Sequence, residues 1–232
     1  RRGENGRDGG CGGGLTTRRA ARASADGEVL GIDLSSQLLD VARARAADLD
    51  NARFVRGDAQ VHPFTPEHYD VVVSRTGVMF FGDRVAAFQN LRAATRAGGR
   101  MALLTWQPPD RNEWISGTVG VLGGSPGPAA DPDAPGMFAL SRPERIRQIL
   151  GDAGWADVEV EGVEGKEWFG EDVEDAMGFL RGLFAWLVEE RTPDEREAAF
   201  ERLRESVAAH AGPDGVEFGS AAWLITARRG ES

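Results

Sequence analysis

The sequence is poor in the residue types that build disulfides, metal clusters and membrane spans. Among its 232 residues Cys11 is the single cysteine, so a disulfide within the chain and a cysteine-based zinc site are both excluded. No apolar run approaches the roughly 18 residues that a membrane helix needs. The first residues also lack the apolar stretch of a signal peptide. We therefore expect a cytoplasmic protein with no metal site and no membrane partner.

Tyrosine and lysine are equally scarce, and positive charge is in deficit. Tyr69 and Lys166 are the only residues of their kinds and lie 97 positions apart, so the Tyr-x-x-x-Lys pair of short-chain reductases is absent. The 37 acidic residues outnumber the 27 basic ones, which gives a net charge of −10. Because no basic patch stands out to neutralise phosphates, we do not expect a nucleic-acid partner.

The most informative stretch that is present is DGGCGGG, residues 8–14. Glycines at a turn between a strand and a helix let the backbone approach a ligand, and they aim helix N-terminal amides at it. Asp33 ends the next apolar stretch, GEVLGID, where an acid can accept hydrogen bonds from ribose hydroxyls. This pattern predicts a site for a nucleoside-type cofactor.

Strand-like and helix-like segments alternate along the chain. Helical periodicity and apolar runs predict, in order, a helix at 15–25, a strand at 28–33, a helix from 35, strands at 52–56 and 69–74, a helix at 83–96 and a strand at 100–106. This alternation is typical of a doubly wound α/β sheet. Further helices are expected after capping boxes at Ser141…Glu144 and Thr192…Glu195.

The stretch 107–136 is rich in proline and glycine and interrupts this alternation. We interpret it as a lid or loop over the carboxyl ends of the strands, where ligands bind in such sheets. A disordered surface excursion is the alternative. We expect one domain over 1–232, with 107–140 as the lid or loop insertion and 170–212 as a helical segment.

Three acids follow three consecutive predicted strands: Asp8, Asp33 and Asp58. Together with the glycine stretch and the segments GDAQVHPF, YDVVVSRTGVMFF and NLRAATRAGGRMALLTW, this series resembles the class I S-adenosylmethionine-dependent methyltransferases. The resemblance is to their small-molecule group, which includes the ubiquinone and menaquinone biosynthesis methyltransferases. The phasing D-x-G-C-G-x-G differs from the G-x-G-x-x-G of dinucleotide-binding enzymes. A nicotinamide-dependent oxidoreductase is therefore the weaker alternative.

The resemblance implies a mostly parallel, seven-stranded Rossmann-like sheet in the order 3-2-1-4-5-7-6, with an antiparallel last strand. It also implies S-adenosylmethionine as cofactor and a small-molecule acceptor. The implied cofactor-binding residues are Asp8, Gly10, Gly12, Gly14, Asp33, Leu34, Asp58, Ala59 and Ser74. The acceptor, the atom methylated, any general base and the oligomeric state are left open.

Each of these residues has an implied role. The glycines would form the turn against the methionine and ribose, and Asp8 would hold the methionine ammonium. Asp33 would bind both ribose hydroxyls, and Asp58 would accept from the adenine amino group. Ser74 would line the methionine end together with Arg75. The run Met79-Phe80-Phe81 is predicted to be core and not a substrate wall.

The segment RRGENGRD, which ends at Asp8, fits the resemblance poorly. It contains no apolar residue, although the implied first strand lies in mid-sheet, where a buried arginine without a partner is costly. We therefore expect a doubtful first strand. A truncated or altered N-terminus is the hypothesis that follows, and a family member without activity is the alternative function.

Overall fold

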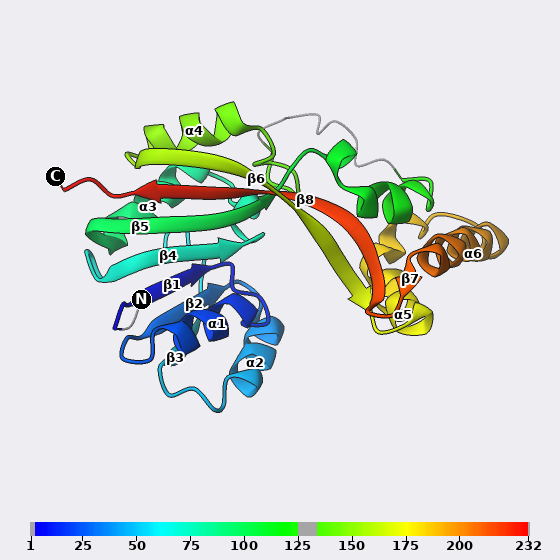
Figure 1. Cartoon of the computed structure of the whole chain (residues 1–232), viewed down its shortest axis with the longest axis horizontal. Coiled ribbons are helices and arrows are strands. Elements are labelled where there is room, and N and C mark those ends of the chain that lie inside the picture. The colour runs from blue at the N-terminus through cyan, green and yellow to red at the C-terminus, as the bar shows by residue number, and fades with distance from the viewer. Residues whose placement is uncertain (1–2, 125–133, 232) are drawn as a thin grey trace. The chain divides into compact units, whose positions relative to one another are not determined.

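The computed structural model describes residues 3–124 and 134–231, which form a mixed α/β fold (Figure 1). The strands are β1 (Gly6–Gly9), β2 (Val29–Asp33), β3 (Ala52–Arg56), β4 (Tyr69–Arg75), β5 (Thr95–Trp106), β6 (Ala156–Gly170), β7 (Ala211–Gly212) and β8 (Gly215–Arg228). The helices are α1 (Leu15–Ala23), α2 (Ser36–Arg45), α3 (Arg84–Ala94), α4 (Pro143–Asp152), α5 (Val173–Phe184) and α6 (Pro193–Ala209). Short helical turns are η1 (Val78–Phe80), η2 (Pro109–Arg111), η3 (Ile115–Gly120) and η4 (Ala185–Leu187).

The strands form one sheet in the order β3-β2-β1-β4-β5-β8-β6, and the two-residue β7 pairs with β8. β1 runs parallel to both β2 and β4, and the pairs β2–β3 and β4–β5 are also parallel. β8 runs opposite to β5 (Figure 1). With β7 set aside, this is the predicted order 3-2-1-4-5-7-6 with an antiparallel strand at the end of the chain, so the fold prediction is confirmed.

The chain divides into two compact units. Unit 1 consists of residues 1–106, 135–161 and 223–232, and unit 2 consists of residues 107–134 and 162–222. The predicted insertion at 107–140 and the helical segment at 170–212 fall mostly in unit 2. Residues 125–133 of the predicted lid lie outside the described residues, and the lid role stays a prediction. None of the helices in the described ranges combines the length and the apolar character that a membrane span requires.

Unit 1 covers both faces of its sheet with helices. α1 and α2 lie on one face and α3 on the other (Figure 1), and α3 contacts α4. The larger core joins α3 and α4 to the strands through Phe88, Leu91, Ile146, Ile149, Val72 and Met101. A smaller cluster lies on the α1 side. Because β1–β4 run parallel, their carboxyl ends all lie at the same edge of the sheet.

In unit 2, α5 packs against α6, and α6 packs against η3. The buried Asn112 joins two segments, since its side-chain oxygen accepts from Trp114 Nε1 (3.1 Å) and from the backbone N–H of Ala221 (2.9 Å). Glu113 accepts from the N–H of Gly219 at 2.7 Å and also contacts His210. The backbone hydrogen bond, followed by His210, keeps the pKa of Glu113 below its usual value.

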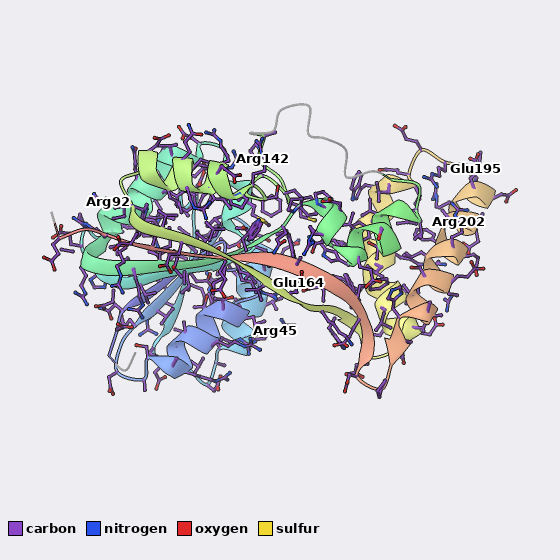
Figure 2. All side chains as sticks on the ribbon, turned by 45° about the horizontal axis from the view of Figure 1, so that its top comes forward. Arg45, Arg92, Arg142, Glu164, Glu195 and Arg202 are labelled. Carbon is purple, nitrogen blue, oxygen red and sulfur yellow. The ribbon has the colours of Figure 1, made fainter. Side chains whose placement is uncertain are left out.

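The two predicted capping boxes have different outcomes. The box at Thr192 is confirmed: Thr192 Oγ1 accepts from the N–H of Glu195 (3.3 Å), and Glu195 returns a bond to the N–H of Thr192 (3.0 Å) at the start of α6 (Figure 2). The box at Ser141 is wrong. Pro143 is the first helical residue of α4, so Arg142 takes the N-cap position without a side-chain bond and Ser141 lies one residue too early.

The structure corrects the expectation of a doubtful first strand, because residues 6–9 form β1. β1 lies between β2 and β4, and all four of its residues are buried. The two polar residues before β1, Glu4 and Asn5, form contacts with neighbouring strands at the rim of the sheet. Glu4 forms a two-pronged ion pair with Arg100 (2.6 and 2.8 Å), which lowers the pKa of Glu4 to about 2. The N–H of Asn5 donates to Asp70 at 2.7 Å.

Arg7 of this strand has a fully buried side chain in mid-sheet. None of its guanidinium nitrogens has a hydrogen-bond partner among the described residues. The guanidinium carbon lies 4.0 Å from the centroid of the Phe64 ring and 5.6 Å from that of Tyr69. Burial lowers the pKa of Arg7 to about 9. A cation–π contact stabilises by about 2 kcal/mol, less than the cost of burying a charge.

Asp8 is also fully buried, and as the next residue of a strand it faces the opposite side of the sheet. Thr17 Oγ1 of α1 donates to Asp8 Oδ2 at 2.7 Å, while Oδ1 has no hydrogen-bond partner in the described part of the chain. Burial raises the pKa of Asp8 to about 6, although the bond from Thr17 opposes this. β1 thus buries two ionisable side chains, one on each face.

We predict that Arg7→Met stabilises the protein, because it removes a buried guanidinium while keeping a long side chain. The free energy of unfolding should rise by about 1–4 kcal/mol in urea titrations. Arg53→Met is the control, since Arg53 lies exposed on the edge strand β3; it should change stability by less than about 1 kcal/mol. A clear loss of stability in Arg7→Met would show that the guanidinium is satisfied in solution.

The raised pKa of Asp8 predicts a pH dependence. Between the ordinary value of 3.8 and about 6 the folded state binds more protons than the unfolded state, so stability falls as pH rises through this range. Asp8→Asn removes this contribution. Its stability relative to the parent protein should therefore increase by up to about 3 kcal/mol between about pH 4 and about pH 7. A relative stability that does not change with pH would contradict the burial of Asp8.

Candidate functional site

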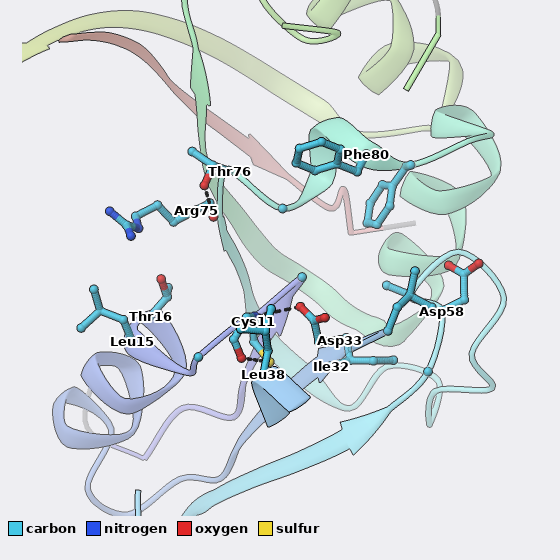
Figure 3. A pocket seen from close by; sticks show the side chains of 18 of the residues that line it. Cys11, Leu15, Thr16, Ile32, Asp33, Leu38, Asp58, Arg75, Thr76 and Phe80 are labelled. Carbon is cyan, nitrogen blue, oxygen red and sulfur yellow. Dashed lines mark hydrogen bonds between the residues drawn. The ribbon is translucent and has the colours of Figure 1, made fainter. Parts of the chain in front are cut away.

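A cavity of about 550 Å³ opens at the carboxyl ends of β1, β2, β3 and β4, entirely within unit 1 (Figure 3). This volume is within the range of about 300–1,000 Å³ that small-molecule sites occupy. Its lining comes from four loops and two helices: residues 10–13, 32–34, 57–60 and 75–77, Phe80 and Phe81 beyond the last loop, Leu15 and Thr16 of α1, and Leu38 and Arg45 of α2. The cavity therefore lies where the sequence predicts a ligand.

The glycines of the first loop are required for different reasons. Gly10, Gly12 and Gly14 all have left-handed backbone angles, with φ of 72°, 51° and 78°. A Cβ on Gly10 would lie 2.8 Å from Cα of Gly77, and one on Gly14 would lie 2.8 Å from Cβ of Ala42. Gly12 has open space around the corresponding position. The loop is thus packed tightly at Gly10 and Gly14 and leaves room at Gly12, which lines the cavity.

Asp33 connects the end of β2 to this loop. Its Oδ2 accepts from the N–H of Gly12 at 2.8 Å, and its Oδ1 accepts from the N–H of Ser35 at 2.9 Å. Because each carboxylate oxygen can accept a second hydrogen bond, the side chain keeps capacity for two ligand hydroxyls. Leu34 follows it and is 65% exposed on the cavity wall. The pair offers hydrogen-bond acceptors beside an apolar surface.

Asp58 is held in a fixed orientation at the end of β3. Its carboxylate accepts from the N–H of Gln60 at 2.9 Å and from Gln60 Nε2 at 3.0 Å. Gln60 also accepts from the N–H of Asp83, which ties the loop to the start of α3. Ala59 lies between them and is buried. Gln60 was not predicted as a site residue, and its position two residues after an acid at a turn is the signal that could have found it.

The structure brings together most of the predicted site residues, but three lie away from the cavity surface. Gly10, Gly12, Asp33, Leu34, Asp58 and Ala59 line the cavity, whereas Asp8, Gly14 and Ser74 do not. Ser74 is buried and its Oγ donates to the carbonyl of Gly9 at 2.6 Å. Asp8 and Ser74 thus support the loop from its buried side, and their predicted contacts with the cofactor stay predictions.

The loop after β4 contributes residues that the sequence did not assign. Thr76 lines the cavity with φ of 57°, a rare conformation for a β-branched residue. A Cβ on Gly77 would lie 2.7 Å from the carbonyl oxygens of Gly9 and Gly10, so this loop packs directly on the glycine loop. The two loops are therefore held in contact by glycines on both sides.

The core prediction for Met79, Phe80 and Phe81 is correct for two of the three residues. Met79 and Phe81 are buried, but Phe80 is 56% exposed and lines the cavity. The residues lie at the 3₁₀ turn η1, in which successive side chains point about 120° apart. One of three consecutive apolar side chains therefore has to face away from the core. Apolar composition alone gives no signal for which one it is.

Comparison with known proteins agrees with this geometry. Residues 8–99 match the family described as methyltransferase domain. The demethylmenaquinone methyltransferase of Staphylococcus aureus is 31% identical over 100 residues, which cover 43% of this chain and 42% of that protein. A ubiquinone/menaquinone biosynthesis C-methyltransferase of Idiomarina loihiensis is 31% identical over 100 residues, covering 42% and 40%. The chain thus spans about two fifths of the length of these relatives.

Solved structures show the same fold. The YcgJ protein of Bacillus subtilis has a TM-score of 0.63 at 18% identity and covers 100% of this chain and 94% of its own. Phosphoethanolamine N-methyltransferase 2 of Haemonchus contortus, in complex with S-adenosyl-L-methionine, has a TM-score of 0.59 at 18% identity, covering 99% and 49%. The matched residues 8–99 contain the glycine loop, Asp33 and Asp58, so the part of the chain that lines the cavity matches a methyltransferase domain.

Proposed function

We propose that this protein transfers the methyl group of S-adenosylmethionine to a small organic molecule bound in the same cavity. One observation carries the proposal: the glycine loop, Asp33 and Asp58 come from three separate strand ends and line one cavity. A ligand that spans all three needs a hydroxyl-bearing ring near Asp33 and a hydrogen-bond donor near Asp58. The ribose and adenine of the cofactor have these groups.

The residues present fit this cofactor. Each oxygen of Asp33 already accepts one backbone N–H and can accept one ribose hydroxyl as well. Open space at Gly12 lets the ligand approach the backbone of the loop. Leu34 can pack on the adenine, and Asp58, fixed by Gln60, can accept from its amino group. The roles of these residues are proposals that rest on their position in the cavity.

When bound, the cofactor supplies a methyl group on a sulfonium, whose carbon–sulfur bond breaks with both electrons left on sulfur as a thioether. The protein then has to hold the acceptor's nucleophilic atom in line with that bond. Proximity and orientation can lower the barrier by about 7–11 kcal/mol. A general base is needed only if the acceptor atom carries a proton that it holds tightly.

The acceptor is proposed to be small because the cavity must hold it together with the cofactor in about 550 Å³. The names of the relatives mention quinone biosynthesis, but their resemblance covers only about two fifths of their length. The net charge of −10 still favours a partner other than nucleic acid. A cytoplasmic location stays a prediction.

Calorimetry with S-adenosylhomocysteine tests this proposal. We predict that the protein binds it and that Asp33→Ala weakens binding by at least about 30-fold, since two charge-assisted hydrogen bonds are lost. Asp58→Asn should weaken it by about 3–10-fold. Asp40→Asn is the matched control, because Asp40 lies exposed on α2 and does not line the cavity. A protein that is stabilised by NAD and not by S-adenosylhomocysteine would contradict the proposal.

A further inference from the structure

Arg75 is a cavity residue that takes no part in the proposed binding of the nucleoside, although the resemblance places it at the methionine end of the cofactor. It ends β4, is exposed and lines the cavity. Within the described part of the chain its guanidinium has neither a hydrogen bond nor an ion pair. Some other arginines of unit 1 are paired, as Arg100 is with Glu4 and Arg22 is with Asp48. Because this guanidinium is exposed, lines the cavity and has no salt-bridge partner in the described ranges, it can bind an anionic group of a ligand.

The backbone next to Arg75 is fixed at several points. The N–H of Thr76 donates to the carbonyl of Leu104 at 2.8 Å, and Thr76 Oγ1 donates to the carbonyl of Arg75 at 2.8 Å. These bonds hold Thr76 in its left-handed conformation. Gly77 then packs on the glycine loop. A strained residue persists where the surrounding structure determines it, and such residues cluster at ligand sites. The point from which Arg75 leaves the strand is therefore rigid.

The charges of the cavity are also separated. Asp58 and Arg75 lie on opposite sides of the view in Figure 3. The carboxylates face the region proposed for the nucleoside. Phe80 adds an exposed aromatic surface to the lining. The lining thus offers the guanidinium of Arg75 and the aromatic ring of Phe80 in addition to the groups proposed to bind the nucleoside.

We propose that Arg75 selects the acceptor, and that the acceptor is a small organic acid with an apolar or aromatic body. A guanidinium binds a carboxylate through two parallel hydrogen bonds, which fixes orientation as well as position. The apolar body would pack on Phe80. This inference rests on the proposed function, because it assumes that the nucleoside of the cofactor occupies the side of Asp33 and Asp58.

A carboxylate near Arg75 could also come from the methionine part of the cofactor, and the experiment separates the two sources. The first arm measures the affinity of Arg75→Gln for S-adenosylhomocysteine and for 5′-methylthioadenosine, which lacks that carboxylate. The second arm titrates benzoate and its neutral analogue benzamide into protein saturated with S-adenosylhomocysteine. Arg45→Gln is the control, because Arg45 also lines the cavity with no side-chain partner in the described ranges but lies on α2.

The proposal predicts that benzoate binds the saturated protein at least about tenfold more tightly than benzamide. Arg75→Gln should abolish this difference, whereas Arg45→Gln should keep it. The affinity of Arg75→Gln for S-adenosylhomocysteine should stay within about twofold of the parent protein.

Two results would overturn the proposal. One is the absence of a benzoate preference, including no binding of either compound at about 20 mM. The other is an Arg75→Gln variant that loses affinity for S-adenosylhomocysteine but not for 5′-methylthioadenosine. That result would show that Arg75 binds the methionine carboxylate of the cofactor and not the acceptor. A parent protein that does not bind S-adenosylhomocysteine at all would instead contradict the proposed function itself.

Discussion

The burial of β1 in the middle of the sheet is the constraint on which the rest of unit 1 depends. β1 pairs with β2 on one side and β4 on the other, so it determines where the glycine loop leaves the sheet. This strand has no apolar side chain, yet both of its faces are covered. Its place is maintained by backbone pairing to two neighbours and by ion pairs and hydrogen bonds of Glu4 and Asn5 at the rim. The cost of burying Arg7 and Asp8 is offset by these contacts and by the packing of the surrounding sheet.

The cavity follows from the position of that strand. Three contacts fix the loop after β1. Ser74 donates to the carbonyl of Gly9, Asp33 accepts from the N–H of Gly12, and Gly77 of the loop after β4 packs on its backbone. The ends of β1, β2 and β4 thus hold one another in place, and the residues that follow them line the same cavity. Each oxygen of Asp33 can still accept one more hydrogen bond, and the backbone at Gly12 has open space beside it. Binding of the cofactor therefore needs little rearrangement of the residues proposed to hold it.

Much of this arrangement could be predicted from the sequence, because it is local or periodic. The alternation of apolar runs and helical periodicity predicts the sheet, and the acids after successive strands predict Asp33 and Asp58 at one edge. The first strand could not be predicted, since its pairing with β2 and β4 and its ties to Asp70 and Arg100 depend on residues distant in the chain. The exposure of Phe80 depends on the geometry of the turn η1. The burial of Ser74 depends on its hydrogen bond to the carbonyl of Gly9, which is also distant in the chain. The start of α4 was misplaced because Pro143, not Ser141, decides its first turn.

Amide hydrogen exchange tests the central claim most directly, namely that this polar strand delivers a working cofactor loop. We expect the amides of residues 6–9 to be protected in the free protein, because β1 pairs on both sides. Addition of S-adenosylhomocysteine should then slow exchange in residues 10–14 and around Asp33. Unprotected amides in β1, or protection in the loop that S-adenosylhomocysteine does not change, would contradict the account.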